Sequence, residues 1–133
     1  MSRKSRIVLP GVPHHVTQRG SRRAPVFFGD EDRALYLQLL KYYCDRYGVL
    51  ILAYCLMINH VHHILVPLSV EALARTLGAT HMRYAQIING MKAWTGHLWQ
   101  ERFFSSALDD EYLWAALRYV ERNPVTSGLV THA

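Results

Sequence analysis

The stretch VLILAYCLMINHVHHILVP, residues 49–67, decides the fold that we predict for this chain. Residues 49–57 form a continuous apolar run, which is typical of a central strand covered by a helix on at least one face. A tight connection at residues 58 and 59 then reverses the chain into a second strand, which ends at Pro67. We therefore expect two antiparallel neighbours, with three histidines near the turn end of the hairpin.

The residues before this hairpin predict one strand and one helix. Residues 14–18 include β-branched side chains and indicate a short first strand. The acidic residues 30–32 are typical of a helix N-terminus, and apolar side chains recur after them at helical spacing. Gly48 is expected to end this helix in a left-handed conformation.

The residues after the hairpin predict further helices and one more strand. Ser69 is expected to cap a helix that Gly78 breaks, and residues 82–91 are expected to form a second helical stretch. Residues 103–108 indicate a short strand. A last helix is expected over residues 109–123, because Pro124 disfavours helical geometry in the residue before it. The remaining tail is expected to dock through Leu129 and Val130.

The predicted order is strand, helix, strand, strand, helix, strand, helix, within a single domain over residues 1–133. This order fits an α+β fold, with a ferredoxin-like, split βαβ antiparallel sheet and helices packed on it. RNA-recognition domains share that architecture, so the fold alone does not decide function.

Composition and charge exclude several classes of protein for this chain. Half of the 133 residues are apolar and 19% are charged, which argues against disorder. The net charge of +5 favours a polyanionic partner such as nucleic acid. Cys44 and Cys55 lie in apolar or helical patterns without metal-ligand spacing, as expected in a reducing compartment. The apolar stretch before Pro10 is too short for a signal peptide and the run at 49–58 too short to span a bilayer, so we expect a soluble, cytoplasmic protein.

The histidines of the hairpin are candidate metal ligands. Side chains alternate along a strand, so His60 and His62 share one face while Val61 and His63 share the other. Two imidazoles about 7 Å apart on one strand can reach a single metal ion. A His-x-His pair by itself is more often a pair of ordinary hydrogen-bonded residues, so a further signal is needed.

That signal is a tyrosine and an asparagine near the C-terminus. Tyr119 and Asn123 are four residues apart on the last turn of the predicted helix and face the same way. A divalent ion held by His60, His62 and Asn123 would keep positions open for a phosphate oxygen, with Tyr119 beside it as a nucleophile.

Other residues compete for these roles. Glu121 and Gln100 are alternative third ligands, and Tyr112 is an alternative nucleophile one heptad before Tyr119. His15 is a further histidine expected near the site.

Basic residues flank the loop and helix expected nearest the site, and we predict that four of them bind DNA. Aromatic and basic residues are also interleaved near residues 92–99, a pattern that suits stacking on unpaired bases but equally fits core or rim side chains. The four predicted DNA-binding residues are Arg19, Arg22, Arg23 and Arg118.

Four motifs in order along the chain resemble one family. They are HHVTQRGSRR at 14–23, NHVHH at 59–63, GHLWQERFFSS at 96–106 and YVERNPVTSGLV at 119–130. Together they are similar to the single-tyrosine HUH transposases, specifically the REP-associated tyrosine transposase branch. The resemblance covers nearly the whole chain.

The resemblance implies a mechanism and a set of roles. The matching histidines, His60 and His62, would bind a Mg²⁺ or Mn²⁺ ion with Asn123 as third ligand, and Tyr119 would be the nucleophile. The family nicks single-stranded DNA near hairpins such as REP-like palindromes, through a 5′-phosphotyrosine link that needs no ATP. The same branch implies a monomer.

The chain departs from the family at two places. Ile58 stands where a proline is common, and Thr126 and Ser127 replace a more usual basic and small pair. Two other hypotheses remain beside the strand transferase: a non-catalytic module of the same fold that binds hairpin or single-stranded nucleic acid, and a metal phosphodiesterase that uses water.

Overall fold

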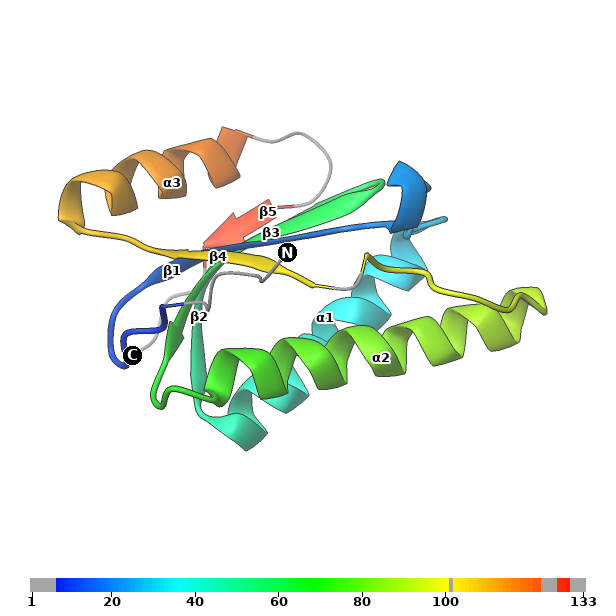
Figure 1. Ribbon diagram of the computed structural model, residues 1–133. Helices are drawn as coiled ribbons and strands as arrows, with labels where there is room; N and C mark the ends of the chain where they lie inside the picture. The colour runs from blue at the N-terminus through cyan, green and yellow to red at the C-terminus, as the bar shows by residue number, and fades with distance from the viewer. Residues whose placement is uncertain (1–6, 101, 123–126, 130–133) are drawn as a thin grey trace, which may run out of the picture.

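The computed structural model describes residues 7–100, 102–122 and 127–129 (Figure 1). Its helices and strands follow one another as β1 (His14–Arg19), η1 (Ser21–Arg23), α1 (Asp30–Tyr47), β2 (Val49–Met57), β3 (His60–Pro67), α2 (Ala72–Lys92), β4 (Phe104–Ala107), α3 (Asp110–Arg122) and β5 (Ser127–Leu129). Within these residues, the five strands form one sheet in the order β4-β1-β3-β2-β5, and each neighbouring pair is antiparallel. The first four strands have the ferredoxin-like order, so the predicted fold class is confirmed.

The helices lie on both faces of this sheet. In Figure 1, α1 and α2 lie below the sheet and α3 lies above it. Alternation along β3 therefore sends neighbouring side chains to different layers. Val61 and Leu65 join the core under α1 and α2, whereas Ile64 joins the smaller cluster packed against α3.

The central hairpin forms as the sequence predicts. Met57 pairs with His60 across the turn, and Val49 pairs with Pro67 at the far end. The register shifts between Ile51 and Ala53, where β2 has an irregularity. The regular pairing near the turn places the histidines at one end of the two central strands. The last residue of β1, Arg19, pairs with His60 at this end.

The first helix has the predicted ends. Asp30, Glu31 and Asp32 occupy its first turn, where their charge favours the positive end of the helix dipole. Gly48 caps the other end with φ of 80°, and its N–H donates to the carbonyl of Cys44. Glycine adopts this left-handed conformation at low cost, which ends α1 directly before β2.

Two predictions for α2 are wrong. Ser69 does not cap this helix, because its N-cap residue is Glu71 and no side chain forms a capping hydrogen bond. Gly78 does not break it, because α2 is one continuous helix. A glycine inside a helix costs roughly 1 kcal/mol relative to alanine. Gly78 is exposed, while Leu77 and His81 beside it are buried against the sheet and α1. Burial of a leucine contributes about 1.5–3 kcal/mol, which outweighs the glycine cost.

The last helix also follows its sequence signals. Asp109 caps α3, since the N–H of Tyr112 donates to its Oδ1 at 3.0 Å. Its amphipathic face packs on the sheet through residues that include Leu113 and Leu117. The segment beyond it was expected to dock through Leu129 and Val130. Leu129 pairs with Ala53 in β5, a strand that the sequence did not predict, and Val130 lies outside the described residues.

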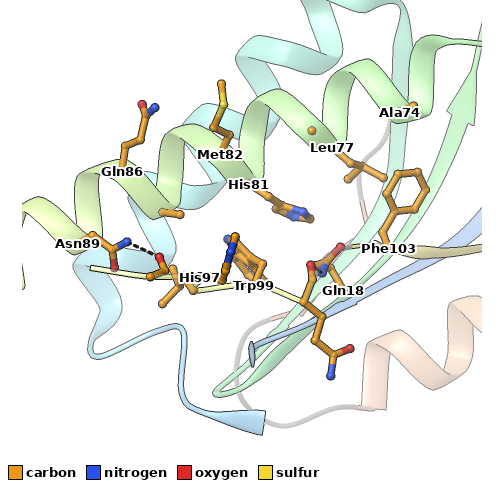
Figure 2. A pocket seen from close by; sticks show the side chains of 15 residues that line it. Gln18, Ala74, Leu77, His81, Met82, Gln86, Asn89, His97, Trp99 and Phe103 are labelled. Atoms are coloured by element: carbon orange, nitrogen blue, oxygen red, sulfur yellow. Dashed lines mark hydrogen bonds between the residues drawn. The ribbon is translucent and has the colours of Figure 1, made fainter. Parts of the chain in front are cut away.

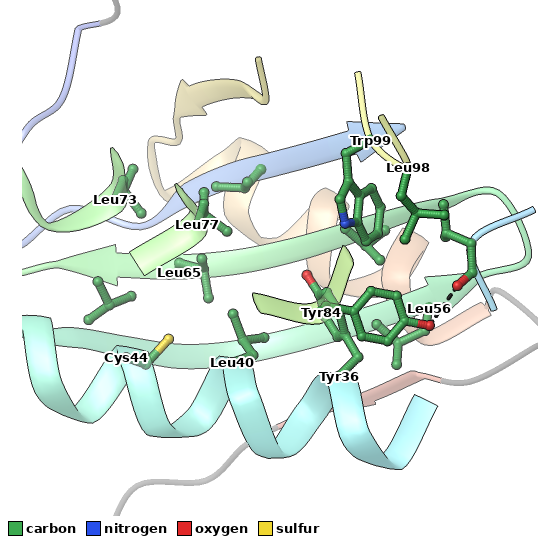
Figure 3. Packing of buried hydrophobic residues seen from close by; sticks show 14 of the residues in the cluster. Tyr36, Leu40, Cys44, Leu56, Leu65, Leu73, Leu77, Tyr84, Leu98 and Trp99 are labelled. Atoms are coloured by element: carbon green, nitrogen blue, oxygen red, sulfur yellow. Dashed lines mark hydrogen bonds between the residues drawn. The ribbon is translucent and has the colours of Figure 1, made fainter. Parts of the chain in front are cut away.

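The main core fills the space between the sheet and the two lower helices (Figure 3). Tyr36 and Tyr84 are fully buried there beside the central strands. The hydroxyl of Tyr84 donates to the carbonyl of Val26 at 2.6 Å, which satisfies a polar group that would otherwise be costly to bury. No helix in the described part of the chain is long and apolar enough to cross a membrane.

Candidate active site

His60 and His62 lie together on the α3 face of the sheet. Their ring centroids are 4.7 Å apart, with the rings nearly perpendicular. Strand alternation places both side chains on one face, as predicted, and the turn at Asn59 leaves His60 partly exposed. The pair therefore combines one ring near solvent with one buried ring.

A hydrogen bond to Asn59 fixes the tautomer of His60. The Nδ1 of His60 lies 2.7 Å from the Oδ1 of Asn59. An amide oxygen only accepts, so Nδ1 carries the proton and the lone pair of the neutral ring is on Nε2. This is the arrangement by which a partner hydrogen bond orients a metal-binding histidine.

His62 is oriented in a similar way from β1. Its Nδ1 lies 3.3 Å from the Nε2 of His15 and 3.4 Å from the hydroxyl of Thr17. The ring of His15 also stacks on that of His62, with centroids 5.4 Å apart. The Nε2 of His62 is buried and has no hydrogen-bond partner among the described residues. A buried, unpaired imidazole nitrogen is costly, and a metal ion is one partner that would satisfy it.

The surroundings keep both rings neutral at physiological pH. Burial lowers the pKa of His62 to about 4, and His60, His15 and Arg19 add to this effect by charge repulsion. Burial, and then the charge of Arg19, also lowers the pKa of His60. Neutral imidazole is the form that binds metal ions, so this donor pair fits a divalent cation.

Helix α3 brings Tyr119 to the same place. Leu113, Ala116 and Leu117 pack on the cluster of Ala53, Cys55 and Ile64, which lies beside the two histidines on that face of the sheet. The rings of Tyr119 and His62 meet edge to face, with centroids 5.5 Å apart. The side chain of Tyr119 is 54% exposed, so a substrate can approach it from solvent. The structure thus brings together three of the four residues that we predicted to form the site.

Two of the three third-ligand candidates cannot be placed relative to this group. Asn123 lies outside the described residues, as does the side chain of Glu121. Gln100 lines a cavity beside α2 that neither His60 nor His62 lines. In the part of the chain that the structure describes, no three His, Cys, Asp or Glu side chains are placed to hold one metal ion.

Two partners of the histidines could not be assigned from the sequence. His15 was expected near the site without a role, and Thr17 was not singled out. Their positions at alternate residues of β1 put them on the face of His62, and Thr17 is the register partner of His62. Only the pairing of β1 with β3 reveals this, because strand register is a long-range property.

On the other face of β3, His63 belongs to a buried polar network. The hydroxyl of Tyr36 lies 2.8 Å from the Nε2 of His63 and 2.8 Å from the Nε2 of His81. The hydroxyl donates to one imidazole and accepts from the other, so the two rings are different tautomers. His63 therefore points away from His60 and His62, as strand alternation predicts. The network anchors the underside of the strand that carries His60 and His62.

The predicted DNA-binding arginines are exposed, and two of them are next to site residues. Arg19 pairs with His60 across β1 and β3, and Arg118 precedes Tyr119 on α3. Arg22 and Arg23 lie in η1, which is tied to the hairpin turn by the N–H of Gly20, a donor to the carbonyl of Asn59 at 2.8 Å.

A separate cavity of about 570 Å³ lies between α2 and residues 96–103 (Figure 2). Trp99 and His81 form part of its wall, together with the polar side chains of Gln18 and Asn89. It contains neither His60, His62 nor Tyr119. We place the candidate active site on the opposite face of the sheet, because the potential ligands and the phenol meet there.

Comparison with known proteins agrees with this arrangement. The structure is similar to a REP-associated tyrosine transposase bound to a REP hairpin, with a TM-score of 0.71 and 16% identity over 91% of this chain and 72% of that one. It is also similar to a candidate transposase from Deinococcus radiodurans R1, with a TM-score of 0.61 and 21% identity over 90% of this chain and 96% of that one. Among curated proteins, none matches this chain in sequence. Residues 10–123 match the family model described as "Transposase IS200 like", and the chain therefore belongs to the family of IS200-like transposases.

Proposed function

We propose that this transposase is a metal-dependent single-stranded DNA endonuclease and strand transferase that nicks DNA near hairpins through a 5′-phosphotyrosine intermediate on Tyr119. The observation that carries the proposal is the contact between Tyr119 and His62, whose ring centroids are 5.5 Å apart on an exposed face of the sheet. The structural relative that was solved with a REP hairpin supports hairpin DNA as the substrate.

In the proposed reaction, the phenolic oxygen of Tyr119 attacks the phosphorus of the scissile phosphodiester. A bond forms between this oxygen and phosphorus, and the bond from phosphorus to the 3′ oxygen of the preceding nucleotide breaks. The phenol loses its proton, and the departing 3′ oxygen gains one. One phosphodiester replaces another, so the 3′-OH of a DNA strand can later reverse the step and release Tyr119 without ATP.

His60 and His62 would hold the divalent cation, Mg²⁺ or Mn²⁺, with Asn123 as the proposed third ligand. Such an ion would polarise the scissile phosphate and stabilise the charge that develops on it. Asn59 and His15 orient the two imidazoles, which leaves each Nε2 available. Imidazole ligands suit Mn²⁺ better than Mg²⁺, so we expect stronger binding of Mn²⁺.

The four exposed arginines would hold the DNA backbone around the site. Arg19 and Arg118 are next to the proposed ligand His60 and the proposed nucleophile Tyr119, respectively. Arg22 and Arg23 extend the positive surface past the hairpin turn. Each phosphate contact releases counterions, so binding should weaken as salt concentration rises.

The first prediction tests the nucleophile. A hairpin oligonucleotide with single-stranded flanks, incubated with Mn²⁺, should become covalently attached to the protein and migrate with it in a denaturing gel. Tyr119→Phe should lose the adduct and keep its affinity for the oligonucleotide, because only the attacking oxygen is removed. Tyr112→Phe is the matched control, since Tyr112 is an exposed tyrosine on the same helix and should leave the adduct unchanged.

The outcomes separate the three hypotheses. An adduct that persists in Tyr119→Phe would assign the nucleophile to another residue. Cleavage without any adduct would favour a phosphodiesterase that uses water. Binding without cleavage in the unaltered protein would favour a non-catalytic nucleic-acid-binding module.

A further inference from the structure

A second cluster of side chains lies beyond the hairpin turn, where the start of α1 meets the end of α2. Phe28 is 41% exposed and Trp94 is 48% exposed, and their rings meet edge to face with centroids 5.6 Å apart. The ammonium of Lys92 lies 4.2 Å from the Phe28 ring centroid and 5.3 Å from that of Trp94. Single exposed apolar residues are common, but two aromatic rings grouped around one cation are not explained by burial. We call Phe28, Lys92 and Trp94 the aromatic cluster.

The backbone holds the aromatic cluster in place. Directly after α2, Ala93 takes a left-handed conformation with φ of 55°, and the N–H of Trp94 donates to the carbonyl of Asn89. A non-glycine residue in this region costs roughly 1–2 kcal/mol, so the turn is kept by its hydrogen bonds. The side chain of Asn89 also donates to the carbonyl of Gly96, the bond drawn in Figure 2. These hydrogen bonds hold the backbone on both sides of Trp94, which presents its ring next to Phe28 and Lys92.

A small cavity lies between the aromatic cluster and residues 20–26, which we call the arginine loop. It has a volume of about 190 Å³, and Phe28 and Trp94 form one side of it. Ser21, Ala24 and Pro25 form another side, and these residues flank the exposed Arg22 and Arg23.

The arginine loop in turn leads to the candidate active site. The side chain of Asn59 donates to the carbonyl of Arg23, and the N–H of Val26 donates to the carbonyl of Ile58. Asn59 is also the residue that orients His60. Hydrogen bonds thus connect the hairpin turn before His60 to the arginine loop, and the small cavity lies between this loop and the aromatic cluster.

The chemistry of this surface selects a ligand with both a flat ring and a negative charge. Aromatic faces stack on bases of any sequence, and nearby cations attract the phosphate backbone. A second cavity also borders Phe28 and Lys92, and three carboxylates line it: Asp30, Glu31 and Asp32. These carboxylates would repel phosphate, so a nucleic-acid strand is expected to approach from the side of Arg22 and Arg23.

We propose that the aromatic cluster is a stacking site for an unpaired DNA base, on the same strand whose phosphate lies at Tyr119. The site would bind a single-stranded flank of the substrate and orient this strand along the arginine loop. This inference rests on the proposed function for its substrate, but it concerns binding and can be tested without metal or cleavage.

The experiment measures binding of fluorescent DNA without divalent metal. The probes are an oligothymidylate of about twelve nucleotides, within the range that single-strand grooves cover, and a blunt hairpin without flanks. Trp94→Ala and Phe28→Ala should each weaken oligothymidylate binding by about five-fold to a hundred-fold, the usual loss for one stacked base. Binding of the blunt hairpin should be unchanged.

Tyr42→Ala is the matched control. Tyr42 is an exposed aromatic residue of α1, and it lies 12 residues beyond Asp30 at the start of that helix, which corresponds to about 18 Å. Its replacement should leave both affinities unchanged. A thermal unfolding curve for each variant, expected to match that of the unaltered protein within a few degrees, separates lost stacking from misfolding.

A series of abasic probes makes the test sharper. Each probe lacks the base at one DNA position. For the unaltered protein, affinity should fall when the missing base is the one that stacks on the aromatic cluster. For Trp94→Ala, the same probe should bind as well as intact DNA. Equal oligothymidylate affinity for Trp94→Ala and the unaltered protein would overturn the proposal. An equal loss for the blunt hairpin would also overturn it, since the site would then not select unpaired bases. Both results are independent of whether Tyr119 forms an adduct.

Discussion

Single hydrogen bonds decide which imidazole nitrogens can act at this site. His60 donates from Nδ1 to Asn59, and the Nδ1 of His62 contacts His15 and Thr17. The Nε2 of His62 has no hydrogen-bond partner among the described residues, and burial lowers the pKa of both rings, which favours the neutral form. At the scale of residues, the proposed metal site depends on the neighbours of the histidines as much as on the histidines themselves.

Asn59→Ala should weaken Mn²⁺ binding about ten-fold to a hundred-fold, because His60 loses the acceptor that fixes its tautomer. Asn59→Asp keeps an acceptor oxygen and should retain most of the affinity. Calorimetric titration with Mn²⁺ measures this directly, and Asn89→Ala serves as the control, since Asn89 bonds to Gly96 away from the site. Undiminished affinity in Asn59→Ala would remove this residue from the metal site.

At the scale of elements, the loop between β1 and α1 holds the histidine hairpin at its turn. Its N–H groups at Gly20 and Val26 donate to the carbonyls of Asn59 and Ile58, the two residues of the turn. The loop is tight at Gly20, where an added Cβ would meet the carbonyl oxygen of Ala24 and lie 2.9 Å from Cγ1 of Val26. The path of this loop therefore depends on glycine for space.

Gly20→Ala should lower the free energy of unfolding by about 1–3 kcal/mol, the usual cost of forcing extra atoms into a packed place. Gly29→Ala is the matched control, because nothing lies within 4 Å of its added Cβ. Urea unfolding of both variants measures the difference. If the two variants unfold at the same urea concentration, the loop is looser than its contacts indicate.

At the scale of the whole molecule, stability is tied to the buried network beneath the sheet. Burial lowers the pKa of His81 to about 3, and the same cause lowers that of His63 well below its usual value. Tyr36 lies between these two rings, and Trp99 stacks on His81 with centroids 4.5 Å apart. Protonation of this network would place a charge in the core, so the fold requires neutral imidazoles.

The sign of the pH dependence follows from these pKa values. The pKa of His81 is about 3 in the folded chain and about 6.5 when unfolded, so the unfolded state binds more protons between these values. Stability should therefore fall as pH falls through this window, by about 2 kcal/mol for this histidine at pH 5. Urea unfolding at pH 7.5 and 5 measures the loss, and His81→Gln should show a smaller one. An equal loss in His81→Gln would assign the effect to other groups.

The sequence by itself determined the elements whose signals are local. The apolar run at 49–57 and the alternation after it fixed the central hairpin, and with it the shared face of His60 and His62. The acidic start and Gly48 fixed both ends of α1, since capping depends on neighbouring residues only. The resemblance of four motifs pointed to Tyr119, although its role and that of Asn123 remain predictions.

Only the tertiary structure decided the features that depend on distant contacts. Burial against the sheet keeps α2 continuous through Gly78, and pairing with β2 makes residues 127–129 a strand. The docking of α3 brings Tyr119 to His62, and the meeting of the ends of α1 and α2 groups Phe28 with Trp94. These arrangements are set by packing and strand register between segments far apart in the chain, and local sequence patterns carry little information about them.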